Sequence, residues 1–226
     1  METKIELTGT IDNSPTLTKN KLFDSSEIEY IFVGKNIGFS KANNLILDQI
    51  KELSNYHLIL NPDVLFDSDI LVKLIRELEG KTEIAMIAPK VVSPDQKHQF
   101  TCRKHPVLSE LIYRRLGLKK EMTNEREYRN LEMSKPFYPE FIHGCFQLFK
   151  TEVFVKIRGF DERYFLYMED ADICREIEAI GLKVFYFPKV TIQHIHRRGS
   201  AKRIKLLYHH FISALKYFNK WKIKNR

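Results

Sequence analysis

The sequence has few cysteines and no long apolar run. Its three cysteines, Cys102, Cys145 and Cys174, are odd in number and form no Cys-x-x-Cys pair. We therefore expect reduced thiols rather than a disulfide framework. No stretch reaches the roughly 18 to 20 apolar residues of a membrane span, and residues 1–20 lack the basic start and apolar run of a signal peptide. These absences predict a cytoplasmic protein, and 226 residues of ordinary globular composition predict one main domain.

Acidic residues are absent from everything after Glu178. Twelve of the 37 lysines and arginines follow that residue. The other 25 are fewer than the 29 acidic residues, so the net charge of +8 comes from the C-terminal segment. Apolar residues from Leu207 to Trp221 recur at helical spacing, which predicts a helix whose first half packs on the domain. The aromatic residues and lysines of 217–224 also suit an anionic membrane surface. No nucleic-acid-binding motif accompanies the basic tail, so we expect no nucleic-acid partner.

Short β-rich runs alternate with helical ones along the chain, which predicts an α/β fold. The expected strands are Ile5–Ile11, Glu29–Val33, Tyr56–Leu60, Ile84–Ala88, Ile142–Phe149 and Lys183–Phe187. The expected helices are Ser40–Leu53, Asp67–Glu79, Val107–Leu116, Thr151–Ile157, Glu169–Ile180 and Ala201–Trp221. The charged stretch Lys119–Lys135 lacks apolar periodicity, so we expect a mobile loop there, either a lid or a plain surface loop.

Two of the expected strands run directly into an acidic turn. Asp12 follows the first strand, and Asp63 follows Tyr56–Leu60 through Asn61 and Pro62. Ligands of open α/β sheets bind outside the carboxyl ends of the strands, where a carboxylate can serve a ribose hydroxyl or a metal ion. Asp and Asn next to Pro are also ordinary turn formers, so a purely structural role stays open for both acids.

A third acidic cluster, at residues 169–172, follows the aromatic run 164–167. Acidic side chains suit the first turn of a helix, so capping is one interpretation. The aromatic wall could also desolvate one of the carboxylates, which raises its pKa and makes it a better general base. In that case Asp170 or Glu169 would take a proton from an incoming hydroxyl.

Histidine and arginine residues follow the last expected strand. His194 and His196 point to the same side of an extended segment, which suits a metal ion, although a structural pair is the alternative. The segment 197–200 then offers two guanidinium groups, a glycine and a hydroxyl before a helix N-terminus. That combination suits a phosphate.

Five elements, in the same order, resemble those of family 2 rhamnosyltransferases with a GT-A fold. They are the N-x-G segment within Gly34–Asn44, the reduced D-x-D motif Leu60–Asp63, the acceptor-side stretch Gly144–Phe165, the E-D-x-D segment Glu169–Cys174, and His194 with Arg198 and Ser200. Their shared order is more specific than any one of them. The resemblance implies a Rossmann-like mixed sheet flanked by helices over residues 1–200. A basic amphipathic helix over 201–226 would pack on this domain or on a membrane surface.

The resemblance also implies a reaction. A sugar, with rhamnose suggested, would be transferred with inversion from a nucleotide-sugar donor to a glycan or lipid-linked acceptor in bacterial polysaccharide biosynthesis. Asp170 would be the base with Glu169 beside it, and Asp63 with His194 would hold Mg²⁺ or Mn²⁺ at the diphosphate. Further donor contacts would come from Asp12, Asn36, Gly38, Asn43, Asn61, Arg198 and Ser200. The acceptor side would be formed by Gly144, Asp161 and Glu162.

One feature departs from the family pattern. Its members usually begin with a strand and a helix before the segment that matches 11–14, and only ten residues precede Ile11 here. The sequence therefore predicts an N-terminally truncated form of the fold. An active enzyme, a non-catalytic remnant or scaffold, a chain completed by another polypeptide and a start further upstream all stay open, as does the oligomeric state.

Overall fold

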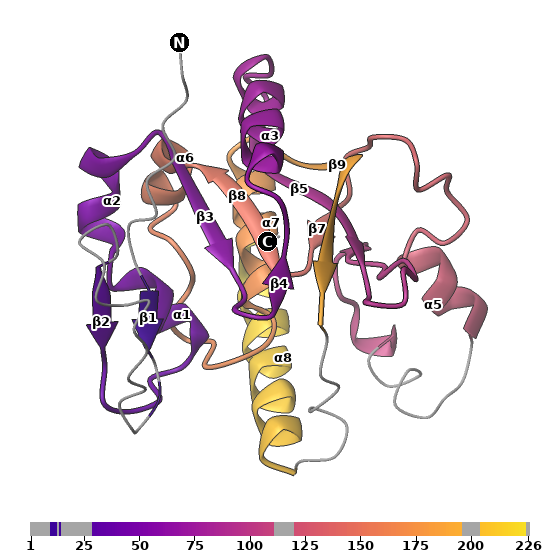
Figure 1. Ribbon diagram of the computed structural model, residues 1–226. Helices are drawn as coiled ribbons and strands as arrows, with labels where there is room; N and C mark the ends of the chain where they lie inside the picture. Colours follow the sequence, from indigo (N-terminus) through magenta and orange to yellow (C-terminus); the bar gives the residue numbers. More distant parts are fainter. Residues whose placement is uncertain (1–9, 13, 15–28, 111–119, 196–203, 225–226) are drawn as a thin grey trace.

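A mixed five-stranded sheet forms the centre of the protein (Figure 1). The structure is a computed structural model that describes residues 10–12, 14, 29–110, 120–195 and 204–224. Neighbouring strands follow the order β3-β8-β5-β9-β4, and among the described strands of this sheet only β5 and β9 pair in parallel. The bounds of these strands are β3 Tyr56–Leu60, β4 Val64–Leu65, β5 Ile84–Val92, β8 Phe146–Lys150 and β9 Lys183–His194.

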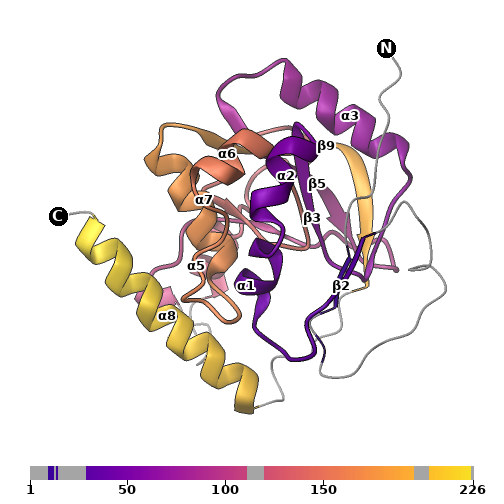
Figure 2. The same ribbon diagram turned by 90° about the vertical axis from the view of Figure 1, so that its left-hand side faces the viewer.

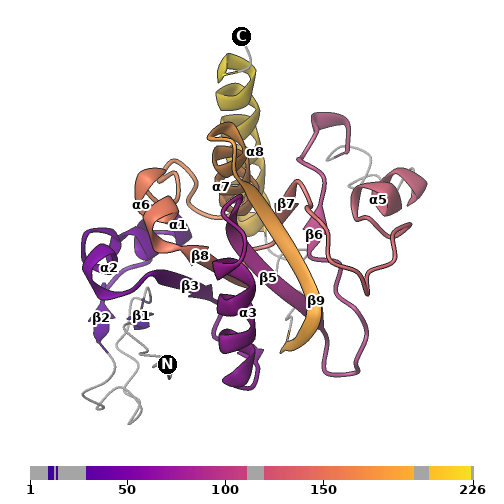
Figure 3. The same cartoon turned by 90° about the horizontal axis from the view of Figure 1, so that it is seen from above.

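Helices cover both faces of this sheet, and each face has its own apolar core (Figure 3). On one face lies α3, whose buried residues Ile70, Leu71, Leu74 and Leu78 follow helical spacing. The opposite face packs against α7 and α8, with α6 and α2 beside them. The bounds of these helices are α2 Leu47–Leu53, α3 Asp69–Glu79, α6 Thr151–Lys156, α7 Glu169–Ala179 and α8 Ile204–Lys224.

Alternation along β9 shows how the sheet serves both cores. Phe185 and Phe187 belong to the core under α3, whereas Val184 and Tyr186 belong to the core under α7. Successive side chains of a strand point to opposite faces, and a strand covered on both faces is apolar at nearly every position. The same logic explains why β5 is buried along almost its whole length.

Smaller elements surround the central sheet (Figures 1 and 2). Strands β1 and β2 pair in parallel on the β3 side of the molecule, and β6 pairs antiparallel with β7. Their bounds are β1 Thr10–Asp12, β2 Tyr30–Phe32, β6 Cys102–Arg103 and β7 Phe141–Ile142, and the short helix α1 spans Phe39–Asn44. Of the expected strand Ile5–Ile11, residues 5–9 lie outside the described residues, as does 111–116 of the expected helix Val107–Leu116.

Two expected elements are divided in the structure. The helix predicted over Ser40–Leu53 is two helices, α1 and α2, separated at residues 45–46. The strand predicted over Ile142–Phe149 is also two, because a turn at residues 143–145 moves the chain from β7 to β8. Gly144 lies in the middle of that turn, where the chain leaves one sheet and enters the other.

The last strand is longer than the sequence predicts. Pro188 ended the expected strand Lys183–Phe187, but β9 continues to His194. The register of the β5–β9 pair shifts at this point, since Phe187 pairs with Pro89 and Thr191 pairs with Lys90. The residues between them form an irregular bulge, which accommodates the proline without ending the strand. His194 is therefore the final residue of β9 and does not follow it.

The prediction of a loop over Lys119–Lys135 is wrong for its first part. Helix α5 spans Lys120–Arg126. Charged contacts hold this segment where apolar periodicity is absent: Arg126 lies 2.6 Å from buried Glu110, and Arg103 lies 2.6 Å from buried Glu127. A search for apolar spacing misses a helix that is attached through ion pairs.

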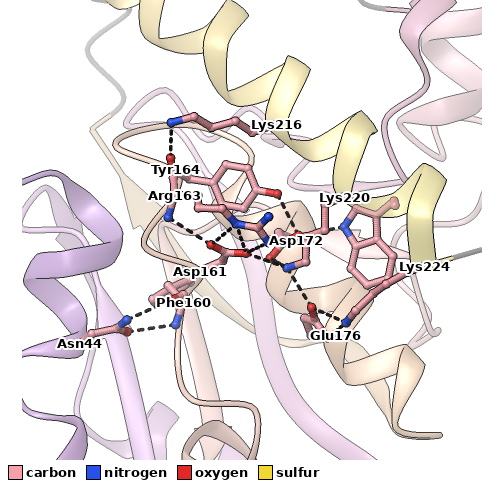
Figure 4. A network of polar contacts seen from close by, with 11 residues as sticks. Asn44, Phe160, Asp161, Arg163, Tyr164, Asp172, Glu176, Lys216, Lys220 and Lys224 are labelled. Carbon is pink, nitrogen blue, oxygen red and sulfur yellow. Dashed lines mark hydrogen bonds and ion pairs between the residues drawn. The ribbon is translucent and has the colours of Figure 1, made fainter.

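A buried charge cluster attaches α8 to α7 (Figure 4). The ammonium group of Lys220 lies 2.6 Å from Asp172, 2.8 Å from Glu176 and 3.0 Å from Asp161. The indole N–H of Trp221 and the hydroxyl of Tyr164 both donate to Asp172, at 2.8 and 3.1 Å. Each charge in the cluster therefore has a partner of opposite sign or a hydrogen bond.

The exposed side of α8 is not the one that the sequence suggested. Tyr217, Lys220 and Trp221, assigned above to a membrane-facing end, are buried against the domain. Tyr208 and Phe211, in the half expected to pack, are 61% and 59% exposed. Among the described residues, no helix combines the length and the apolar character that a membrane span requires.

We predict that Lys220→Met lowers the free energy of unfolding by about 3 kcal/mol, because it leaves the carboxylate of Asp172 buried without its counter-charge. The Lys220 side chain is 8% exposed and that of Asp172 is 1% exposed. Urea denaturation measures the loss. Lys224→Met is the matched control, since Lys224 also pairs with Glu176 but is 46% exposed. Equal denaturation midpoints for the two variants would contradict the prediction.

Candidate functional site

Asp63 and His194 meet at one end of the central sheet. Val64 pairs with His194 across β4 and β9, and the backbone N–H of Ile195 donates to the carbonyl oxygen of Asp63 at 2.9 Å. This pairing brings the Asp63 carboxylate to 3.2 Å from Nε2 of His194. The His194 side chain is 9% exposed and that of Asp63 is 39% exposed, so the pair opens to solvent on the aspartate side.

Gln99, which sequence reasoning missed, holds the other side of His194. Its Nε2 donates to the backbone carbonyl of His194 at 2.8 Å, and its Oε1 lies 3.0 Å from Nδ1 of the same histidine. A glutamine in the loop after β5 carries no motif of its own, so only the fold reveals its contact with a residue 95 positions away.

The acidic cluster 169–172 opens α7, directly after two residues in the left-handed conformation, Tyr167 and Met168, each with φ of 70°. The Asp170 carboxylate lies 2.9 Å from Nδ1 of His143 and accepts the backbone N–H of Ala171 at 2.8 Å. Burial opposes ionisation of Asp170, but the contacts with His143 and the backbone N–H donors outweigh it and lower the pKa of Asp170. This carboxylate is therefore held in its ionised form.

The pKa of the neighbouring acid, Glu169, is shifted in the opposite direction. Burial, together with the nearby charges of Asp170 and Asp172, raises the pKa of Glu169 to about 8. The sequence predicted that desolvation would raise the pKa of one acid of the cluster. That acid is Glu169, because the contacts of Asp170 outweigh the effect of its burial. His143, the hydrogen-bond partner of Asp170, was missed, although it stands next to Gly144 in the acceptor-side stretch.

The turn 143–145, which contains His143, connects the two acid–histidine pairs. Its Cys145 carbonyl accepts the backbone N–H of Asn61 at 3.0 Å, which ties it to the Asp63 turn. A Cβ atom on Gly144 would lie 3.7 Å from Cβ of Asp170, which puts the turn against α7. Burial raises the pKa of the Cys145 thiol to about 12, with both Asp63 and Asp170 adding to the shift. The two acid–histidine pairs are therefore connected through this one turn.

The expected donor residues of the 36–44 segment make structural contacts. Asn36 Oδ1 accepts the backbone N–H of Gly38 at 3.0 Å, and the side-chain amide of Asn43 donates to the Phe39 carbonyl. Gly38 has φ of 91°, and a Cβ there would lie 2.6 Å from the Phe165 carbonyl oxygen, so this position requires glycine. The donor-binding roles of these residues stay predictions. Asp12 ends β1, and Arg198 and Ser200 lie outside the described residues.

Two of the expected acceptor-side residues belong to the scaffold. Despite partial burial, hydrogen bonds from Arg163 and Lys220 hold the pKa of Asp161 well below its usual range. Glu162 accepts the side-chain amide of Asn44 at 3.3 Å. Asn44, the last residue of the segment Gly34–Asn44, also exchanges hydrogen bonds of 2.8 and 3.0 Å with the backbone of Phe160. It fixes α1 against this loop, and an acceptor role for Asp161 and Glu162 stays a prediction.

Comparison with known proteins shows similarities in both sequence and fold. The sequence profile described as "Glycosyltransferase like family 2" matches residues 20–208. The chain is 29% identical over 206 residues to the rhamnosyltransferase WbbL of Escherichia coli (strain K12), covering 87% of this chain and 75% of that one. It is 23% identical over 218 residues to the N-acetylglucosaminyl-diphospho-decaprenol L-rhamnosyltransferase of Mycobacterium tuberculosis (strain ATCC 25618 / H37Rv), covering 89% and 69%.

A solved structure shares the fold. The crystal structure of GalNAc-T7 with UDP, GalNAc and Mn²⁺ superimposes with a TM-score of 0.58 at 13% sequence identity. The match covers 86% of this chain but only 38% of that protein, so the likeness concerns the fold of one part of GalNAc-T7.

We predict that Glu169→Gln gains stability relative to the wild type as the pH rises. An acid whose pKa is higher in the folded state than in the unfolded state binds more protons when folded, so stability falls between the two values. For Glu169 this window runs from 4.5 to about 8. Urea denaturation at several pH values should show the difference growing across this window. Glu152→Gln, at an exposed position on α6, is the control. A difference that is constant with pH would refute the assignment of a neutral Glu169.

Proposed function

The chain belongs to the glycosyltransferase-like family 2, and on that premise we propose that it transfers a sugar with inversion from a nucleotide-sugar donor to a glycan or lipid-linked acceptor. Its mixed sheet flanked by helices is the GT-A fold that the sequence predicted. Two rhamnosyltransferases among its relatives favour rhamnose as the sugar. The diphospho-decaprenol in the name of one of them favours a lipid-linked acceptor in polysaccharide biosynthesis.

The observation that carries this proposal is the position of two acids next to the 143–145 turn. Asp63, paired with His194, follows the Asn61 turn that is bonded to Cys145, and Asp170 is paired with His143 of the turn itself. In an inverting transfer, the diphosphate leaves from one face of the anomeric carbon and must be stabilised there. The acceptor hydroxyl attacks the opposite face, where a base must accept its proton. Two separate acid–histidine pairs connected through one turn meet that requirement.

We assign the base to Asp170. It is ionised, and each oxygen of a carboxylate has two lone pairs, so the contacts with His143 and Ala171 leave acceptor capacity for the attacking hydroxyl. Asp170 accepts the proton of that hydroxyl as it attacks the anomeric carbon. His143 orients the carboxylate through Nδ1, and neutral Glu169 avoids a second negative charge beside the base.

Asp63 and His194 fit a divalent cation, Mg²⁺ or Mn²⁺. Adjacent ligands of an octahedral ion with bonds of about 2.1 Å lie about 3.0 Å apart, close to the 3.2 Å between the Asp63 carboxylate and Nε2 of His194. Within the described residues, no group of three or more His, Cys, Asp or Glu side chains is arranged for metal binding. A site with one carboxylate and one imidazole suits an ion that takes its other ligands from phosphate and water. When bound, the ion would neutralise charge on the departing diphosphate.

We further propose that the protein is cytoplasmic and that α8 rests on the anionic inner face of the cell membrane. Ile204, Tyr208, Phe211 and Leu215 recur at helical spacing and are between 50% and 87% exposed. Exposed lysines, such as Lys205 and Lys216, lie on the same helix. An apolar stripe with flanking lysines binds anionic lipid surfaces, and such a position brings the site to a lipid-linked acceptor.

Binding and turnover should separate the two acids. In calorimetry with dTDP-, UDP- and GDP-sugars, we expect the wild type to bind one nucleotide class in an Mn²⁺-dependent manner. Asp63→Ala should lose that dependence, because it removes the carboxylate ligand. Asp170→Asn should bind the donor normally, while the rate of transfer to a lipid-linked acceptor falls by roughly 10²- to 10⁴-fold.

Asp67→Ala is the matched control for this experiment, since Asp67 is exposed and lies four residues after Asp63. It should bind and transfer as the wild type does. A folded wild type that binds none of the three nucleotides would favour the remnant or a chain completed by a partner. Metal-dependent binding that survives Asp63→Ala would place the cation elsewhere.

Membrane association should depend on the outer face of α8. We expect the protein to co-sediment with vesicles that contain phosphatidylglycerol but not with neutral phosphatidylcholine vesicles, and Phe211→Glu should abolish binding by adding charge to the apolar stripe. Leu131→Glu, another exposed apolar position away from α8, is the control. Binding of Phe211→Glu at the wild-type level would exclude this face.

A further inference from the structure

The hydrogen bonds of Gln99 fix where His194 carries its ring proton. The backbone carbonyl oxygen of His194 can only accept, so the amide group that lies 2.8 Å away must be the –NH₂ of Gln99. The amide oxygen of Gln99 is then the atom that lies 3.0 Å from Nδ1 of His194. An amide oxygen can only accept, so Nδ1 must carry a hydrogen. The chemistry of the contacts alone excludes the opposite orientation of the amide.

Backbone contacts hold Gln99 in this place. Its own N–H donates to the carbonyl oxygen of Val91 at 2.9 Å, and the preceding residue, His98, forms a bridge with Val92. Val92 in turn pairs with Gln193, the residue before His194. The chain after β5 thus turns back along the end of β5, and this places the Gln99 side chain next to the end of β9.

The position of the proton on the His194 ring decides whether Nε2 can bind a cation together with Asp63 or instead donates a hydrogen bond to Asp63. With the proton on Nδ1, neutral His194 directs the lone pair of Nε2 toward the Asp63 carboxylate, 3.2 Å away. Two electron-pair donors that face each other favour a cation between them. With the proton on Nε2, the imidazole would instead donate to Asp63, and Nε2 would have no lone pair for a metal ion.

We propose that Gln99 is a positioning residue that fixes His194 as its Nδ1–H tautomer, so that Nε2 directs its lone pair toward the side on which Asp63 and the divalent cation would lie. The cation part of this inference rests on the proposed function of Asp63 and His194. The tautomer part rests only on the contacts of Gln99. Partners that fix the tautomer of a ligating histidine typically change metal affinity by 10- to 100-fold when they are removed.

Two measurements on Gln99→Leu test the inference without an activity assay. The ¹⁵N chemical shifts of His194, measured without metal at about pH 9 where imidazole is neutral, should show a proton on Nδ1 in the wild type and a shift toward Nε2 in the variant. Mn²⁺ titration followed by electron paramagnetic resonance, in the presence of UDP, should show a 10- to 100-fold weaker affinity.

Two further variants keep the test interpretable. Gln193→Leu, on the neighbouring residue of β9 whose side chain points to the opposite face, should match the wild type in both measurements. Gln99→Glu keeps an acceptor for Nδ1–H, so it should keep the wild-type tautomer. Gln99→Met, an unbranched side chain without an acceptor for Nδ1–H, replaces Gln99→Leu if that variant does not fold.

The outcomes separate the inference from the function on which it rests. Equal tautomer populations and Mn²⁺ affinities in the wild type and Gln99→Leu would overturn the role of Gln99 and leave the metal site standing. A wild type that binds no Mn²⁺ would overturn the metal site and with it the cation part of the inference. In that case the ¹⁵N shifts still decide whether Gln99 sets the tautomer.

Discussion

The parallel pairing of β5 with β9 is the constraint on which the rest of the structure depends. It is the parallel contact of the central sheet, and it lies between the core under α3 and the core under α7. Because β9 continues past the bulge at Pro188, it carries His194 to the end of the sheet, where β4 and the loop after β5 supply Asp63 and Gln99. A shorter β9 would leave these three side chains apart.

Three acids in one helical turn have three different environments. Asp172 faces α8 and pairs with Lys220, Glu169 is buried with a raised pKa, and Asp170 is ionised beside His143. Their spacing places them on different sides of α7, and the elements packed on each side set the charge of each carboxylate. The cluster that attaches α8 therefore shares the first turn of α7 with the proposed base.

The sequence predicted the helices and strands whose formation depends on residues within the element itself. Tyr56–Leu60 is the strand expected, and α3, α6 and α7 begin and end within two residues of their expected bounds, since apolar periodicity and acidic first turns act within one element. The divided strand at Gly144, the extension of β9 past Pro188 and the ion-paired helix α5 were not predicted. Each depends on a partner far away in the sequence, which no local pattern contains.

The sequence by itself determined the fold class, the family and the identity of the acids and His194, because residue types in a fixed order are properties of the chain. Only the tertiary structure decided which groups meet. It brought Asp63 to His194, His143 to Asp170 and Gln99 to His194, and it buried Trp221 rather than Phe211. Charge state and tautomer followed from those contacts, since desolvation and hydrogen bonding depend on the neighbours that folding supplies.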